Sequence, residues 1–531
     1  MPTVAGWLTG EQVPQEVIEQ TLNAMGTILG RHGGQVARTI HSGAGLIAFP
    51  DQAYAMTQNT DPPVLDWVPD RRTMVYRRPL SGAHALYYVE NWPAQGNLLF
   101  ASEIKALLAV GVPRRLHLPA IDVLLRYGFI PAPWTAFQNI HVVPAGSILR
   151  WQRAQTVVNH ATDYQVDESL SPADAADQLY TLLDETTASL LPPHEELVAL
   201  SGGDTASALT IALAAQHTKT PFSVASIGYK KGDWTEAKRI ASACKHPFLE
   251  ITGVDSPEYW VATIAGLEAP SVDSIPLALH QLLHTTASET GARVAISGLG
   301  AEIIVGKAMP QFISTPDQTH TQATLEETLH WYSQTASAHS PTGAEIWSQD
   351  ATQLIQQAEP WEELLHARKL ARRASQLPHI WQQWHYLDLH LRLPDLHVST
   401  AQQLATAERM VVRSPYLHTD VMNMFMRLPT MLDDGTSRDT ILTTLLQRSR
   451  LHTRTIQPFA SLVAPTASLL CLSDFELLQQ TLSPEALQAT GIFNPEAVQA
   501  LLRQRERGRA PRELVLMFTT QLLCQLFEVG L

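Results

Sequence analysis

The sequence predicts a two-domain α/β protein, in which a β-rich first domain precedes a parallel sheet with a helical extension. A chain of 531 residues is too long for one ordinary hydrophobic core. Up to about residue 160, short strand-like runs alternate with glycine and proline turns. From about Ser171, long stretches with helical spacing alternate with compact apolar runs. These three observations favour two domains of different architecture.

The first domain is expected over residues 1–165. Its clearest strand-like runs are residues 73–76, 85–90 and 97–101. Glycine and proline turns separate these runs, so a β-rich domain is expected. The family resemblance given below implies that this domain is a β-rich sandwich.

The second domain is expected over residues 171–531. Its apolar runs at 196–200, 222–228 and 293–296 are separated by helices long enough to serve as crossovers. This pattern is typical of a parallel sheet covered by helices on both faces. Residues from about 320 to the end are expected to be almost entirely helical. Helix breaks are expected at Pro394, Pro415, Pro429 and Pro458.

Composition excludes several classes of function. The chain has 37 basic and 51 acidic residues, and a net charge of −14 repels nucleic acid and anionic membranes. No run approaches the roughly 18 apolar residues of a membrane helix, and the N-terminus does not resemble a secretion signal. A cytoplasmic protein is expected. The three cysteines lack CxxC spacing, so neither a disulfide framework nor a zinc site is expected.

A glycine turn follows the first apolar run of the second domain. Glu196-Leu197-Val198-Ala199-Leu200 is followed by Ser201-Gly202-Gly203-Asp204-Thr205-Ala206-Ser207 and then by a helical stretch. At such a strand–turn–helix joint, backbone N–H groups and the positive end of the helix converge where a phosphate can bind. An ordinary αβ turn needs the same residues, so this loop alone does not decide the function.

A second loop strengthens the hypothesis of a nucleotide site. Ser297-Gly298-Leu299-Gly300-Ala301-Glu302 follows another expected strand. Ligands of open parallel sheets bind at the carboxyl ends of the strands, so both loops are expected to face one crevice.

Together the loops resemble the SGGxDS and SGxGxDE loops of the asparagine synthetase family. Phe100-Ala101-Ser102-Glu103-Ile104-Lys105-Ala106-Leu107-Leu108 is similar to the FASEIKALL segment of that family. Arg413-Ser414-Pro415-Tyr416-Leu417 resembles its RVPFLD segment. The resemblance extends over nearly the whole chain, and lasso-peptide cyclases and β-lactam synthetases are related to the same family.

This resemblance implies an Ntn-hydrolase-like glutaminase domain and a synthetase domain of the adenine nucleotide α-hydrolase-like fold. It implies that the synthetase adenylates a carboxylate with Mg²⁺ and ATP before an amine attacks. The positions that match the nucleotide-binding residues of the family are Leu200, Ser201, Gly202, Gly203, Ser207, Ile227, Ser297 and Gly298.

Several positions depart from the family pattern. Pro2 stands where family glutaminases have their cysteine nucleophile, so glutamine hydrolysis is not expected. Thr205 replaces a Mg²⁺-binding aspartate, and the adjacent Asp204 is the candidate substitute. Glu302 matches the other Mg²⁺-binding aspartate and is a candidate metal ligand and catalytic residue. A weakened or lost Mg²⁺ site is therefore expected.

Other departures concern charge at the reacting groups. Leu299 and Ile303 match acidic positions of the family, and Ile456 matches a lysine that would stabilise the leaving pyrophosphate. Arg413 is the candidate cation, since it could pair with a phosphate or a substrate carboxylate. Its alternative role is to hold the last helices in place.

The leading hypothesis is an ATP-dependent, amide-forming ligase without glutaminase activity, acting on a small-molecule or peptide carboxylate. A catalytically inactive protein that binds a nucleotide or a partner is the first alternative. A macrolactam-forming cyclase of lasso-peptide type is the second. The possible protein partners are a second copy of the chain or an active paralogue.

Overall fold

The structure is a computed structural model of the whole chain. It describes residues 3–30, 37–41, 44–49, 64–68, 71–164, 172–193, 196–254, 256–306, 325–327, 330, 346–377, 380–428, 438–449, 476–505 and 511–531. Pro2, Pro429, Pro458, Cys471 and the segment 454–459 with Ile456 lie outside the described residues.

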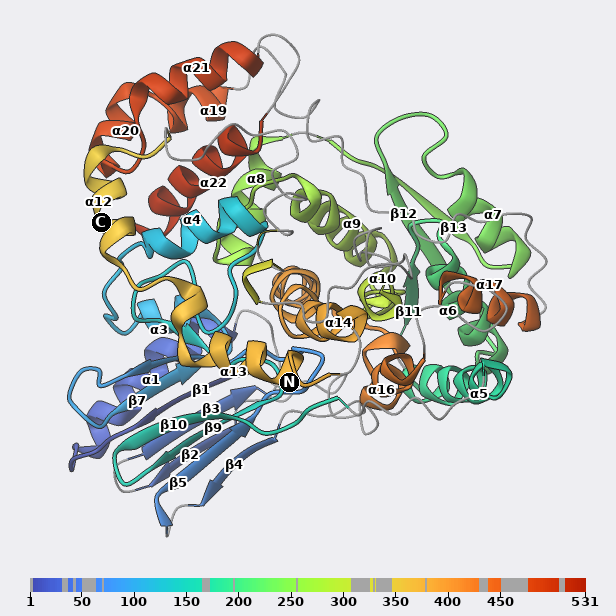
Figure 1. Ribbon diagram of the computed structural model, residues 1–531, viewed down its shortest axis with the longest axis horizontal. Coiled ribbons are helices and arrows are strands. Elements are labelled where there is room, and N and C mark those ends of the chain that lie inside the picture. The colour runs from blue at the N-terminus through green and yellow to red at the C-terminus, as the bar shows by residue number, and fades with distance from the viewer. Residues whose placement is uncertain are drawn as a thin grey trace.

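The first domain contains two antiparallel sheets (Figure 1). The six-stranded sheet has the order β2 (Ala37–His41), β3 (Ala44–Phe49), β1 (Thr3–Leu8), β7 (Leu98–Ala101), β6 (Tyr87–Glu90) and β8 (His141–Val142). The four-stranded sheet has the order β10 (Gln155–His160), β9 (Ser147–Gln152), β5 (Thr73–Arg77) and β4 (Val64–Val68).

A hydrophobic core holds the two sheets together. Val4 and Phe100 from one sheet and Met74 and Trp151 from the other belong to one buried cluster. The opposite face of the six-stranded sheet packs against helix α1 (Gln15–Leu29), whose buried residues include Leu22 and Met25. The six-stranded sheet is therefore covered on both faces, by the second sheet and by α1, and its strands β1 and β7 are buried almost throughout.

The second domain is built on a five-stranded sheet in which all described pairings are parallel. Its strand order is β13 (Phe248–Thr252), β12 (Ser223–Gly228), β11 (Leu197–Leu200), β14 (Val294–Ile296) and β15 (Val411–Arg413). The three expected strands occupy the centre of the sheet, because their continuous apolar runs are buried on both faces.

Helices cover both faces of the parallel sheet (Figure 1). One face carries α5 (Pro172–Leu190), α6 (Thr205–His217), α16 (Thr419–Arg427) and α17 (Arg438–Arg448). The other carries α9 (Ile275–Thr290) and α15 (Ser399–Ala407). Helix α6 is buried along almost its whole length, which explains why its residues are apolar on all sides.

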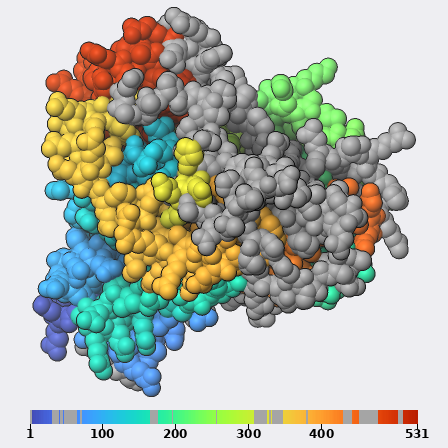
Figure 2. Space-filling view, in the orientation of Figure 1, coloured from blue at the N-terminus to red at the C-terminus, as the bar shows by residue number. Residues whose placement is uncertain are grey.

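The remaining elements of the described chain are mainly α-helices. They are α3 (Ile104–Leu108), α4 (Leu118–Tyr127), α7 (Thr235–Ala243), α8 (Pro257–Leu267), α10 (Ala301–Val305), α12 (Gln349–Gln357), α13 (Leu365–Ala374), α14 (Ile380–His390), α19 (Glu476–Thr481), α20 (Pro484–Thr490), α21 (Pro495–Arg505) and α22 (Arg512–Phe527). Short 3-10 turns occupy Trp361–Glu363 and Pro415–Leu417. The region around α13, gold in Figure 2, lies along the N-terminal domain.

The prediction that a helix breaks at Pro394 is wrong. The chain continues from α14 through a π-helical segment, Leu393–Val398, directly into α15. A π turn shifts the hydrogen-bond pattern by one residue, so the missing N–H of Pro394 is accommodated without ending the helix. Pro415 does mark a break, because it begins a 3-10 turn after β15.

Among the described residues, no helix is both long enough and apolar enough to cross a membrane.

Candidate functional site

The two glycine loops meet at the carboxyl ends of β11 and β14 and border one cavity of about 290 Å³. The predicted site residues that line this cavity are Leu200, Ser201, Gly202, Asp204, Ser207, Ser297, Gly298 and Glu302. Three predicted residues, Gly203, Ile227 and Arg413, are not in the lining. Gly203 is buried within the first loop, and Ile227 packs in the core beneath Leu200.

The first loop is held by its own serines. The Ser201 N–H donates to the carbonyl of Ala225 at 2.9 Å, which fixes the loop to β12. The Oγ of Ser201 accepts from the Gly203 N–H at 3.1 Å and lies 3.2 Å from the Oγ of Ser207. Gly203 has φ +82°, and a Cβ there would lie 2.9 Å from the Cβ of Glu236. The position therefore needs glycine for both its conformation and its close packing.

Asp204 is the N-cap of α6. Its Oδ1 accepts from the Ser207 N–H at 2.7 Å, so one carboxylate oxygen stabilises the start of the helix. Burial raises the pKa of Asp204 to about 6. Thr205, which takes the place of the family aspartate, is buried in the first turn. Asp204 thus presents a carboxylate to the cavity while it caps the helix.

The second loop packs directly on the first. A Cβ on Gly298 would lie 2.9 Å from the backbone nitrogen of Ser207, so only glycine permits this approach. The Ser297 N–H donates to the carbonyl of Arg413 at 2.9 Å, and the Oγ of Ser414 donates to the carbonyl of Leu299 at 2.7 Å. Strand β15 and the residue after it therefore support the loop from behind.

Glu302 lies in the first turn of α10 and lines the cavity. Leu299 and Ile303 also line it, and they contribute apolar side chains where the family has acids. Ile303 is buried, so its side chain packs in the core as well as bordering the cavity.

Asp273, which is not among the residues predicted from the sequence, lines the same cavity. It precedes α9, and its Oδ1 accepts from the Ile275 N–H at 2.9 Å. Burial raises the pKa of Asp273, although the nearby Arg512 guanidinium opposes this shift. The available signal was an aspartate two residues before Ile275-Pro276, which is typical of a helix start.

His397 was also missed. It lines the cavity from the π-helical segment, between Leu396 and the start of α15. Burial, helped by the nearby positive charge of Arg392, lowers the pKa of His397 to about 3. Its Nε2 is buried and has no hydrogen-bond partner among the described residues. A neutral imidazole thus faces the cavity.

Arg413 does not line the cavity. Its side chain is buried, and its Nη1 donates to the carbonyl of Leu190 at 2.5 Å, at the end of α5. This contact joins β15 to the end of α5, the first helix of the second domain, and not to the last helices that the alternative role for Arg413 would involve. Among the described residues that line the cavity, none is a lysine or an arginine.

Residues 179–525 match the asparagine synthase family, and residues 65–164 match a glutamine amidotransferase domain. These matches and the sheet topology confirm the fold class that the sequence predicts. No curated protein matches the chain. A solved structure described as NMN synthetase from Francisella tularensis is similar, with 13% identity and a TM-score of 0.19, over 35% of this chain and 92% of that chain. A likeness of this extent carries no argument.

Proposed function

The chain belongs to the asparagine synthase family, and we propose that it is an ATP-dependent ligase that forms an amide bond without hydrolysing glutamine. The observation that supports this proposal best is the cavity in which both glycine loops meet. It lies at the carboxyl edge of a parallel sheet, where ligands of such sheets bind.

The walls of the cavity suit the two ends of a nucleotide. Leu200, Leu279 and Leu282 form an apolar side that can cover an adenine ring. The N-terminus of α6 points its positive end toward the first loop and favours phosphate oxygens there, although Asp204 already accepts from the Ser207 N–H. Because Gly298 brings the second loop within van der Waals distance of the first, the chain can enclose the phosphates from two sides.

The acidic side chains fit a divalent cation. Asp204, Asp273 and Glu302 all line the cavity, and hard carboxylate oxygens are the ligands that Mg²⁺ prefers. Burial raises the pKa values of Asp204 and Asp273. The positive groups of the protein near these two carboxylates therefore do not fully compensate their negative charge. Among the described residues these three carboxylates do not form one cluster, so Mg²⁺ would be shared between one or two of them and the phosphate oxygens, whose charge it neutralises when bound. Asp273, which is not part of the family pattern, would in this way offset the weakening of the Mg²⁺ site that is expected from Thr205.

The amine comes from ammonia or from the substrate itself in this proposal. Pro2 has no thiol that could attack a glutamine amide. The sandwich domain then serves as a structural platform for the synthetase domain. The second substrate is a small-molecule or peptide carboxylate, which must reach the phosphate end of the cavity.

One observation favours a second candidate, a protein that binds the nucleotide without forming an amide. No lysine or arginine lines the described part of the cavity, and the Arg413 side chain contacts the Leu190 carbonyl. Loss of one cation that stabilises developing charge often removes about 3 kcal/mol of transition-state stabilisation. The two candidates share nucleotide binding and differ in chemistry.

Exchange of labelled pyrophosphate into ATP separates the two candidates. The full chain is incubated with Mg²⁺, ATP and a panel of amino-acid and peptide carboxylates, with ammonium or glutamine as nitrogen source. The ligase proposal expects exchange that depends on one carboxylate, amide formation with ammonium, and no ammonia release from glutamine. Nucleotide binding without exchange for any carboxylate would contradict the ligase and favour the second candidate.

A further inference from the structure

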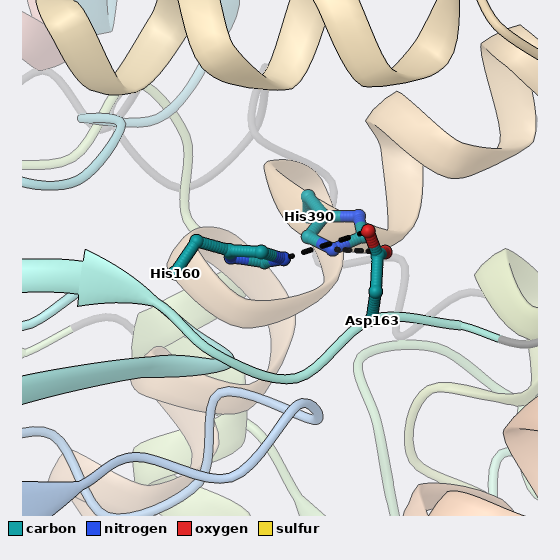
Figure 3. A group of neighbouring side chains, drawn as sticks. All are labelled: His160, Asp163 and His390. Atoms are coloured by element: carbon teal, nitrogen blue, oxygen red, sulfur yellow. Dashed lines mark ion pairs between the residues drawn. The ribbon is translucent and has the colours of Figure 1, made fainter.

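We propose that His160, Asp163 and His390 form a binding site for a divalent metal ion, with Zn²⁺ as the preferred ion, at the junction of the two domains. Figure 3 shows the three side chains pointing toward one another. His160 ends strand β10, Asp163 lies three residues further on, and His390 ends helix α14. This site is separate from the nucleotide cavity and does not depend on the proposed ligase activity.

The spacing of the three groups suits a shared cation. One ligand atom from each residue lies within 4.8 Å of the other two. The Nε2 of His390 is 3.7 Å from Oδ1 of Asp163, and the Nε2 of His160 is 3.9 Å from Oδ2. Ligands of a tetrahedral zinc ion, each about 2.0–2.1 Å from the metal, lie about 3.3 Å apart. Small side-chain movements would therefore bring the three groups to ligand distance.

His390 uses its Nδ1 for a hydrogen bond, so its Nε2 is the ring nitrogen that can bind a metal. Its Nδ1 lies 2.8 Å from the carbonyl of Tyr386, which can only accept, so Nδ1 carries the proton. The Nε2 then presents a lone pair toward the carboxylate of Asp163. Metal-bound histidines typically donate their second ring nitrogen to a carbonyl or carboxylate in this way.

Both imidazoles are buried. The side chains of His160 and His390 are 5% and 1% exposed. Neither ring nitrogen of His160, nor the Nε2 of His390, has a hydrogen-bond partner among the described residues. Buried polar atoms normally have a partner, so these three nitrogens need an explanation. A bound metal ion provides one for a nitrogen of each ring.

The surroundings of Asp163 can orient it as a ligand. Arg373 Nη1 donates to Oδ2 at 2.8 Å, and the Tyr386 hydroxyl donates to the same oxygen at 3.3 Å. Oδ1, which faces His390, remains available for one metal bond. His366 on α13 is close enough for His160 and His390 to contribute, after burial, to lowering its pKa to about 3. Water can fill the fourth position.

A second histidine–carboxylate group in the chain provides a contrast. His280 Nε2 and His284 Nδ1 lie 2.8 Å and 2.9 Å from the two oxygens of Glu408, at hydrogen-bond distance. Those three residues satisfy one another without a metal. The nitrogen-to-oxygen distances from His160 and His390 to the Asp163 carboxylate are about 1 Å longer than these. A longer separation of this kind is expected if a metal ion binds between the groups.

Metal binding here would connect the domains. His160 and Asp163 follow the last strand of the sandwich, whereas His390 belongs to the synthetase domain. Beyond His390 the helix continues into the π-helical segment, whose Leu396 and His397 line the nucleotide cavity. A zinc ion at the junction would stabilise both the domain contact and one wall of the cavity.

The test is calorimetric titration of ZnCl₂ into the full chain after removal of metals by chelation. We expect about one equivalent of bound zinc and a higher thermal midpoint. His160→Gln and Asp163→Asn should each weaken zinc binding at least about tenfold. Replacement of zinc by Co²⁺ should give the visible absorption bands of a four-coordinate ion.

His284→Ala is the matched control, because His284 is half-exposed and belongs to the hydrogen-bonded group. It should leave zinc affinity unchanged. Thermal midpoints measured in chelator establish that each variant folds. Equal zinc affinity in the wild type, His160→Gln and Asp163→Asn would overturn the proposal, as would loss of the bound zinc in His284→Ala.

Discussion

Asp204 illustrates how one residue can serve both fold and site. It caps α6 through the Ser207 N–H and at the same time lines the nucleotide cavity. Its neighbour Thr205, which matches the metal-binding position of the family, points into the first buried turn of the helix. The shift of the carboxylate by one position therefore changes its direction, because neighbouring residues at a helix start face different sides.

The raised pKa of Asp204 predicts a specific pH dependence of stability. A carboxyl group whose pKa rises from 3.8 unfolded to about 6 folded stabilises the protein below pH 3.8 and loses that contribution as pH rises through 6. Asp204→Asn keeps the cap but removes the titration. Between pH 4 and pH 8, we expect the wild type to lose up to about 3 kcal/mol relative to Asp204→Asn.

Thermal midpoints measured at a series of pH values, in chelator and without nucleotide, test this expectation. Asp420→Asn is a suitable control, because the carboxylate of Asp420 is largely exposed at the start of α16. Parallel midpoint curves for the wild type and Asp204→Asn would show that burial does not perturb this carboxyl group.

The contact between the two glycine loops is the main feature at the scale of elements. It depends on Gly298, whose added Cβ would lie 2.9 Å from the Ser207 nitrogen and 3.1 Å from the Ala206 carbonyl carbon. Both neighbours are backbone atoms, so a side chain at this position must separate the loops. Such overpacking typically costs about 1–3 kcal/mol.

Gly298→Ala should therefore weaken ATP binding by about tenfold or more and lower the thermal midpoint. Gly530→Ala is the matched control, because no atom lies within 4 Å of the Cβ that it would add. Fluorescence-monitored melting and ATP titration of both variants check the prediction. Unchanged ATP affinity in Gly298→Ala would place the nucleotide elsewhere.

The sequence predicts the central strands of the parallel sheet well and its edges poorly. Strands β11, β12 and β14 are continuous apolar runs because helices cover both faces of each. Edge strand β13 is only partly buried, and β15 has only three residues, so neither is a continuous apolar run. The π turn at Pro394 depends on tertiary packing, which a local rule about proline does not include.

The residues of the site also divide into those that the sequence predicts and those that it does not. Both loops could be predicted because strand, glycine turn and helix lie together in the sequence. Asp273 and His397 could not, since they reach the cavity from segments that carry no motif of the family and are distant in the chain. The sequence could not show whether Arg413 supplies a cation to the site, because only the fold reveals that its side chain contacts the Leu190 carbonyl.

At the scale of the whole molecule, the chain combines a sandwich without the expected nucleophile and a synthetase domain with an altered site. The end of the first domain contributes His160 and Asp163, and the synthetase domain contributes His390. Under the proposed function, the first domain supports the second through its position rather than through ammonia supply. The central claim is that the cavity between the glycine loops binds a nucleotide with the help of its acidic residues.

Calorimetric titration of ATP into the full chain, with and without Mg²⁺, tests that claim most directly. We expect one ATP per chain, competition by AMP, and binding at least about tenfold tighter with Mg²⁺. The double variant Asp273→Asn, Glu302→Gln should lose the gain from Mg²⁺ and keep its affinity for AMP. Absence of ATP binding at millimolar concentration, or an equal gain from Mg²⁺ in the double variant, would contradict the account.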